Sequence, residues 1–336
     1  MKERFCAALL SLSCIGCFGQ KIDATAVKYM KTITANELKE HLYIVASDKM
    51  EGRETGSEGQ KKAGKYLIEQ YKKDNIPPPA NAPDYYQKIP AAYLNAKSDE
   101  GLNDSENIVA FIEGSEKPEE ILVISAHYDH VGMKGKVVYN GADDDGSGTV
   151  ALLEIAEAFA LAKKDGHGPK RSILFLHVTG EEHGLHGSRF YSENPLFPLA
   201  STIADLNIDM IGRHDALHKS SSEYVYVIGS KRLSTDLYNA VEAAGEQYVN
   251  LKLDYRYDDN NDPEQFYYRS DHYNFAKNGI PVAFFFSGVH EDYHKPGDKA
   301  NKIEYNILEE RTQLAFATAW ILANADKRPV VDKAGN

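Results

Sequence analysis

The sequence contains little cysteine and no long apolar run, and both absences limit what the protein can be. Its 336 residues include three cysteines, Cys6, Cys14 and Cys17, all near the N-terminus, so the remainder of the chain has no thiols from which to form a disulfide. No run of about 18 apolar residues occurs and the mean hydropathy is −0.47, so a membrane-spanning helix is not expected.

Positive charge is also scarce. The chain has 38 lysines and arginines against 50 acidic residues, which gives a formal net charge of −12 and a pI near 5.5. Such an acidic chain is a poor partner for nucleic acid. Hydrophobic residues make up 42% of the sequence, which is enough for one large core, and α/β chains of this length often form one domain.

The N-terminus differs from the rest of the chain. Lys2 and Arg4 precede an apolar stretch over residues 5–18, and Gly19 and Gln20 follow it. This layout is typical of a secretory signal, and it predicts a signal peptide over residues 1–19 and export to the periplasm or the medium. The alternative is a short amphipathic helix. Lipid anchoring is less favoured, because neither Cys14 nor Cys17 has an apolar residue three positions before it.

Periodicity along the chain indicates an α/β fold. Residues 23–75 are predicted to be helical, with an interruption over 52–59 and a second helix over 60–71 that ends before three prolines at 77–79. Residues 80–105 are polar and are predicted to be irregular. Strands are then predicted over 107–112, 121–126, 173–178, 203–208, 224–228 and 281–286, and helices over 149–161, 232–245, 271–277 and 307–323.

This alternation of strands and helices predicts a mostly parallel mixed sheet with helices on both faces. We expect a single catalytic domain over residues 20–327. Its N-terminal helical part and loop would cover 20–105, and its α/β core 106–327. Residues 328–336 are expected to form a flexible tail.

Five clusters of histidine and acidic residues follow one another in the α/β part, and several come directly after a predicted strand. They are His127-Tyr128-Asp129-His130, Asp143-Asp144-Asp145, Glu181-Glu182, Asp209 and Asp292-Tyr293-His294. Ligands collect at the carboxyl ends of strands in open α/β sheets. Two metals that share one ligand need roughly five imidazole and carboxylate groups, and this set supplies them with one glutamate left over as a base.

Some residues in and near these clusters are expected to have other roles. Asp129 is placed to hold His127 rather than to bind metal, because ligating histidines usually donate their second N–H to a carboxylate. His130 is interpreted as a solvated or packing residue. Gly184 and Gly187 argue against a helix that would make His183 and His186 a metal pair, and His177 is expected in the core. A calcium loop at the aspartates lacks the EF-hand spacing.

Together these motifs resemble the di-zinc aminopeptidases of the twenty-eighth metallopeptidase family. The matching motifs are H-Y-D-H-x-G, G-A-D-D-D-x-S-G, T-G-E-E-x-G-x-x-G-S, N-x-D-M-I-G and Y-H-K-P-x-D, preceded by G-R-E-T-G-S-E-G. That family includes bacterial leucyl aminopeptidases, glutamate carboxypeptidase II and, as relatives, glutaminyl cyclases. The resemblance covers roughly residues 50–325.

The resemblance implies a fold, a reaction and a set of roles. The fold would be that of the three-layer zinc exopeptidases, and two zinc ions would bind per chain. Asp144 would bridge them and be joined to Asp145 by a cis peptide bond. His127 and Asp209 would complete one site, and Glu182 and His294 the other. A bridging hydroxide would attack the peptide carbonyl, and the expected substrates are peptides with a free N-terminus.

The resemblance also assigns residues around the metals. Glu181 would be the general base and acid, with Asp129 supporting His127. Tyr267, three residues before Ser270, would assist the tetrahedral intermediate, although the disulfide found around this tyrosine in some family members is missing here. The main alternative is a glutaminyl-peptide cyclotransferase with one zinc; a binding protein with a lost site is another. The sequence carries no signal for an oligomeric state.

Export is testable directly. N-terminal sequencing of the protein purified from its native host is expected to give a mature chain that begins near Gln20, because signal peptidase removes the charged and apolar leader. A mature cytoplasmic protein that still begins at Met1 would show the leader hypothesis to be wrong.

Overall fold

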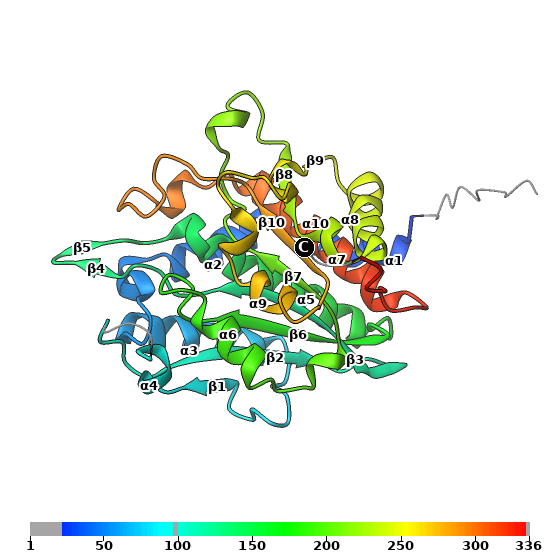
Figure 1. Ribbon diagram of the computed structural model, residues 1–336, viewed down its shortest axis with the longest axis horizontal. Coiled ribbons are helices and arrows are strands. Elements are labelled where there is room, and N and C mark those ends of the chain that lie inside the picture. The colour runs from blue at the N-terminus through cyan, green and yellow to red at the C-terminus, as the bar shows by residue number, and fades with distance from the viewer. Residues whose placement is uncertain (1–21, 97–99, 334–336) are drawn as a thin grey trace, which may run out of the picture.

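A mixed eight-stranded sheet forms the centre of the molecule in a computed structural model that describes residues 22–96 and 100–333 (Figure 1). The strand order is β1-β2-β6-β3-β7-β10-β8-β9. The strands are β1 (Tyr86–Ile89), β2 (Ser105–Ile112), β3 (Lys117–His127), β6 (Arg171–Val178), β7 (Thr202–Ile208), β8 (Tyr224–Ile228), β9 (Lys252–Asp254) and β10 (Val282–Phe286). A separate hairpin joins β4 (Met133–Lys134) to β5 (Val137–Val138) and projects from the body.

The middle of this sheet is parallel and its edges are mixed. Neighbours β6, β3, β7 and β10 all pair in parallel. Strands β1, β2 and β6 pair antiparallel in turn, as do β10 and β8. Parallel strands bring their carboxyl ends to one edge, so three consecutive strands of the core, β6, β3 and β7, deliver the residues that follow them to the same place.

Helices cover both faces of the sheet. Alternate residues of β6 show this, because Ile173 and Phe175 belong to a core shared with α3, α5 and α10, whereas Leu174 and Leu176 belong to one shared with α6, α7 and α9. The helices are α1 (Ala24–Met30), α2 (Ala35–Val45), α3 (Glu58–Lys73), α4 (Ala91–Leu94), α5 (Gly148–Lys164), α6 (His186–Glu193), α7 (Ser230–Leu233), α8 (Thr235–Tyr248), α9 (His272–Ala276) and α10 (Tyr305–Asn324).

The predicted α/β class is therefore confirmed, with differences in the short elements. Residues 80–105 are not wholly irregular, since β1 and α4 lie there. The helix predicted over 232–245 is divided at Ser234, whose extended backbone lets its hydroxyl accept a hydrogen bond from the Leu237 amide. A helix, α6, also begins at His186 despite Gly187, where a Cβ would lie 2.4 Å from Asn107 Oδ1. That glycine permits close packing on the sheet.

The buried guanidinium of Arg53 ties the N-terminal segment to the loops at the carboxyl edge. Its nitrogens donate to the carbonyls of Tyr128 (2.9 Å), Val45 (2.9 Å), Asn140 (2.7 Å) and Gly141 (2.8 Å). Tyr128 follows the last residue of β3, and Gly141 opens the turn into the three aspartates. Arg53 thus fixes two of the segments that carry candidate ligands.

The chain ends are described in part. The predicted signal peptide over 1–19 lies outside the described residues. In the segment predicted to be a flexible tail, Arg328 donates to the carbonyls of Ala200 and Thr202, and the Val330 amide donates to Asp236. Residues 328–333 are therefore attached to the body. Within residues 22–96 and 100–333, no helix combines the length and the apolar character needed to cross a bilayer.

Replacing Arg53 is expected to destabilise the fold strongly. Arg53→Met removes donors from four carbonyls in a buried position, and each unsatisfied buried group costs about 1–3 kcal/mol. We expect urea unfolding to show a loss of at least about 3 kcal/mol in the free energy of unfolding. Arg256→Met, at a partly exposed arginine that pairs with Asp254, is the control. A loss for Arg53→Met no larger than for Arg256→Met would contradict this role.

Candidate metal centre

The residues predicted as metal ligands converge at the carboxyl edge of the parallel core. His127 is the last residue of β3 and Asp209 follows the last residue of β7. Glu181 and Glu182 come three and four residues after β6 ends. Asp144 lies in the turn that leads into α5, and His294 in the loop that follows β10. Segments far apart in the sequence thus meet at one point.

Asp144 lies between two histidines that approach different oxygens of its carboxylate. His127 Nε2 is 3.2 Å from Asp144 Oδ1 and 3.6 Å from Asp209 Oδ1. On the other side, His294 Nε2 is 3.0 Å from Asp144 Oδ2 and 2.9 Å from Glu182 Oε2. The arrangement therefore contains two groups of three candidate ligands that share one carboxylate.

These spacings fit zinc. Four ligands at about 2.0–2.2 Å in a tetrahedron stand roughly 3.4 Å from one another, close to the separations of 2.9–3.6 Å seen in the two groups. Among the described residues, several buried ligand atoms have no hydrogen-bond partner, including His127 Nε2, Asp144 Oδ2 and Glu182 Oε1. Buried polar atoms of this kind call for a partner such as an ion.

The carboxylates here attract positive charge. Burial lowers the pKa of His294, but its contacts with Asp144 and Glu182 outweigh burial and raise that pKa to about 10. For His127 too, burial opposes the charged form and is outweighed by Asp209 and Glu181, so the pKa rises well above its usual value. The carboxylates thus stabilise positive charge at both histidines.

Among the three aspartates, the middle one is the residue whose carboxylate lies within 4 Å of both His127 and His294. Asp143 Oδ1 accepts a hydrogen bond from the Gly212 amide at 2.6 Å, and Asp145 Oδ1 accepts from the amides of Gly148 (2.8 Å) and Met210 (3.1 Å). The flanking carboxylates thus attach the turn to the loop after β7. The peptide bond between Asp144 and Asp145 is cis, as the family resemblance implies.

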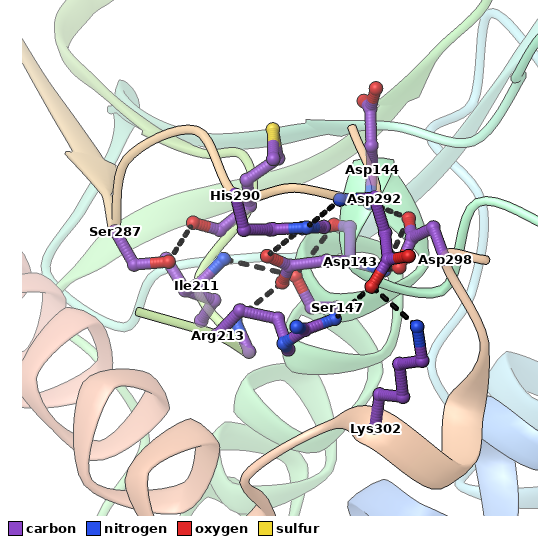
Figure 2. A network of polar contacts seen from close by, with 12 residues as sticks. Asp143, Asp144, Ser147, Ile211, Arg213, Ser287, His290, Asp292, Asp298 and Lys302 are labelled. Carbon is purple, nitrogen blue, oxygen red and sulfur yellow. Dashed lines mark hydrogen bonds and ion pairs between the residues drawn. The ribbon is translucent and has the colours of Figure 1, made fainter. Parts of the chain in front are cut away.

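A second polar network holds the loop of His294 against this turn (Figure 2). Asp298 accepts hydrogen bonds from the amides of Asp143 (3.0 Å) and Asp144 (3.1 Å), and His290 Nε2 is 3.2 Å from Asp143 Oδ2. Asp292 Oδ2 accepts a hydrogen bond from Lys302 Nζ at 2.7 Å and lies 3.3 Å from Arg213 Nη1. The loop between β10 and α10 is thereby fixed on both sides of His294.

Asp129 lies behind His127. Its Oδ1 is 3.7 Å from His127 Nδ1 and its Oδ2 accepts a hydrogen bond from Thr55 Oγ1 at 2.8 Å. His127 Nδ1 is also 3.2 Å from the Asp129 carbonyl oxygen. These contacts turn His127 Nε2 toward Asp144, which is the supporting position predicted for Asp129.

Glu181 and Glu182 face different surroundings although they are adjacent. Glu182 contacts His294, whereas Glu181 lines a narrow cavity together with Asp144 and Asp209. Burial is the largest cause raising the pKa of Glu181; the charge of His127 opposes it, and nearby Asp209 and Glu182 add to the rise. A carboxyl with a raised pKa beside an open space suits proton transfer.

Sequence reasoning underestimated His130. It is fully buried, and its Nδ1 lies 2.7 Å from Glu182 Oε1 and 3.7 Å from Asp144 Oδ2, so it belongs to the ligand cluster rather than to the solvated surface. Within the described part of the chain, two groups of three place their possible ligand atoms within 4.8 Å of one another: His127, Asp145 and Asp209, and His130, Asp144 and Glu182. The sequence signal was the proximity of His130 to His127.

The two tyrosines near the site occupy different places. Tyr267 does not line the cavity, and its ring lies 3.7 Å from the Arg232 guanidinium carbon. Tyr293 does line it and stacks on His294 with ring centroids 3.8 Å apart. Burial raises the pKa of Tyr293, and the charges of Asp144 and Glu182 add to that rise. Tyr293 was overlooked because its motif drew attention to the adjacent histidine.

Three further histidines, which the sequence analysis also considered, lie outside the cluster. His183 pairs with Glu100, and His186 Nδ1 is 2.6 Å from Arg189 Nη2. His177 is buried in β6 and lies 2.7 Å from the Tyr71 hydroxyl, as expected for a core residue.

Comparison with known proteins gives a consistent picture. The model of peptidase family M28 matches residues 107–319. A probable leucine aminopeptidase of Arthroderma otae is 30% identical over 228 residues, which are 66% of this chain and 58% of that protein. A probable zinc metalloprotease of Pyricularia oryzae is 27% identical over 261 residues, 65% of this chain and 50% of that protein. The chain thus spans about half the length of these relatives.

Solved structures share the fold. The aminopeptidase from Aneurinibacillus sp. strain AM-1 superimposes with a TM-score of 0.67 at 17% identity, covering 92% of this chain and 98% of that one. Porphyromonas gingivalis glutaminyl cyclase gives 0.64 at 18% identity, covering 86% and 98%. At these identities the likeness establishes the fold, and both kinds of enzyme use it.

The shared carboxylate can be tested by metal content. Asp144→Asn should lose both zinc ions together, because each group of ligands depends on Asp144, whereas Glu182→Gln should keep about one. Native mass spectrometry of zinc-reconstituted protein gives the count. The control is Asp165→Asn, at a surface carboxylate paired with Lys28. Retention of one tightly bound zinc in Asp144→Asn would contradict a shared ligand.

Proposed function

The chain belongs to peptidase family M28, and we propose that it is an exported aminopeptidase that binds two zinc ions and releases N-terminal residues from peptides. The observation that carries the proposal is the position of Asp144, whose two oxygens face His127 and His294. When bound at such a pair of sites, zinc activates water and polarises a carbonyl as a Lewis acid.

The ligands proposed are those that the sequence predicts. His127 and Asp209 would hold one zinc, His294 and Glu182 the other, and Asp144 both. The separations within each group support this division, and buried His130 would stabilise Glu182 from behind through its 2.7 Å contact. Asp129 and Thr55 would keep His127 in the orientation that presents Nε2.

Glu181 is the proposed general base and acid. It borders the cavity that also contains Asp144 and Asp209, so its carboxylate can take a proton from the attacking water and pass it to the leaving amine. Tyr293 lines the same cavity and Tyr267 does not, so Tyr293 is the proposed donor to the oxygen of the tetrahedral intermediate. Tyr267, packed against Arg232, would instead support the cavity wall.

Acidic groups at the cavity also explain a preference for a free N-terminus. A substrate ammonium placed between Glu181 and Asp209 gains charge-assisted contacts that a blocked terminus cannot make. A cyclase would share the fold but would act on N-terminal glutamine without releasing a residue. The five ligands present here favour two metals and hydrolysis.

Mutation of Glu181 tests the reaction. Glu181→Gln should keep both zinc ions and bind substrate, yet lose at least about 100-fold in kcat, the low end for general acid–base catalysis. Release of single residues from a peptide should stop when the peptide is N-acetylated. Glu119→Gln, at an exposed surface position, is the matched control. Full activity of Glu181→Gln, or equal cleavage of the acetylated peptide, would overturn the proposal.

A further inference from the structure

The cavity beside the metal centre has an unusual combination of walls. It is narrow, about 30 Å³, and its lining includes the acidic residues Asp144, Glu181 and Asp209. The remaining lining is mostly apolar and buried. Its apolar side chains are Met210, Phe266, Phe284, Phe286 and Val289. If the protein is an aminopeptidase, this space receives the side chain of the N-terminal residue, because it adjoins the atoms that would hold the scissile bond.

One positively charged side chain borders this space. Arg269 is the only lysine or arginine among the described residues that line the cavity. Its guanidinium carbon lies 4.7 Å from the centre of the Phe266 ring, so the charge rests on an aromatic wall of the cavity. The arginine is held in place from both sides: its amide donates to the Phe266 carbonyl, and the next residue, Ser270, donates to Asp209 Oδ2 at 2.7 Å.

Arg269 has no strong partner within the described residues. Its nearest carboxylate is that of Glu264, with Nη1 to Oε2 at 3.8 Å, and its hydrogen bond to the Glu264 carbonyl is long at 3.5 Å. The side chains of Arg269 and Glu264 are 41% and 60% exposed, and a long surface pair of this kind contributes little to stability. The guanidinium therefore keeps most of its capacity to bind a carboxylate in its planar, bidentate manner.

We propose that Arg269 makes the enzyme selective for peptides whose N-terminal residue is aspartate or glutamate. An acidic side chain entering the cavity would be desolvated by Met210, Phe284 and Phe286, which are each at most 3% exposed. Burying a carboxylate without a partner is costly, and a charge-assisted bond to an arginine offsets that cost. The narrow space also disfavours a bulky ring.

This selectivity rests on the proposed aminopeptidase function and is tested with matched substrates. Glutamyl and glutaminyl chromogenic amides differ by one charge at nearly equal volume, so their kcat/KM ratio isolates the contribution of the charge. In the wild-type enzyme we expect glutamyl to exceed glutaminyl by at least about 10-fold, the range of a hydrogen bond to a charged group. In Arg269→Gln the ratio should fall to about 1, while hydrolysis of the alanyl and glutaminyl amides changes little.

Further variants make the result decisive. Arg269→Lys should keep part of the ratio, and Arg256→Gln, at another exposed arginine, should keep all of it. Inhibition by free glutamate and free glutamine gives a second readout that needs no turnover, and glutamate should lose its advantage in Arg269→Gln. A wild-type ratio near 1, or an equal fall for all substrates in Arg269→Gln, would overturn the selectivity. Failure to hydrolyse any of the amides would instead contradict the proposed function.

Discussion

Buried carboxylates that repel one another are the constraint on which this structure depends. Asp144, Asp209, Glu181 and Glu182 meet at one edge of the sheet, and within the described residues no lysine or arginine forms an ion pair with any of them. Such a cluster is stable only with compensating positive charge. The carboxylates raise the pKa values of His127 and His294, which favours the positively charged form of both histidines. The two proposed metal ions, with Asp144 as their shared ligand, would supply that charge.

The rest of the fold serves to keep this cluster in place. Parallel pairing of β6, β3 and β7 brings together three strand ends that carry candidate ligands, and hydrogen bonds then fix the loops that strands alone cannot control. Arg53 fastens the loops after β3 and before the aspartates, and Asp298 fastens the aspartate turn to the loop of His294. The site is therefore held by several buried hydrogen bonds of ordinary length rather than by one strong interaction.

Much of this could be read from the sequence, and the failures have physical causes. Apolar periodicity identifies fully buried strands such as β6 and β8. The geometry of α/β sheets then explains the strand-end positions of His127 and Asp209. The short strand β1 could not be found, because four residues in a polar segment carry too little periodicity. The buried position of His130 and the approach of Tyr293 to the cavity depend on loops packing together across long sequence separations, which periodicity does not encode. The family resemblance singled out Asp144 from the three aspartates. The structure gives a physical reason, because the carboxylates of Asp143 and Asp145 accept hydrogen bonds from backbone amides.

The central claim is that Asp144 joins two metal ions, and anomalous diffraction from crystals grown with zinc tests it most directly. Data collected on both sides of the zinc absorption edge should show two peaks of similar height, about 3.5–4 Å apart, one on each side of the Asp144 carboxylate. One peak would lie beside His127 and Asp209 and the other beside His294 and Glu182. A single peak, or two peaks that do not flank Asp144, would contradict the account.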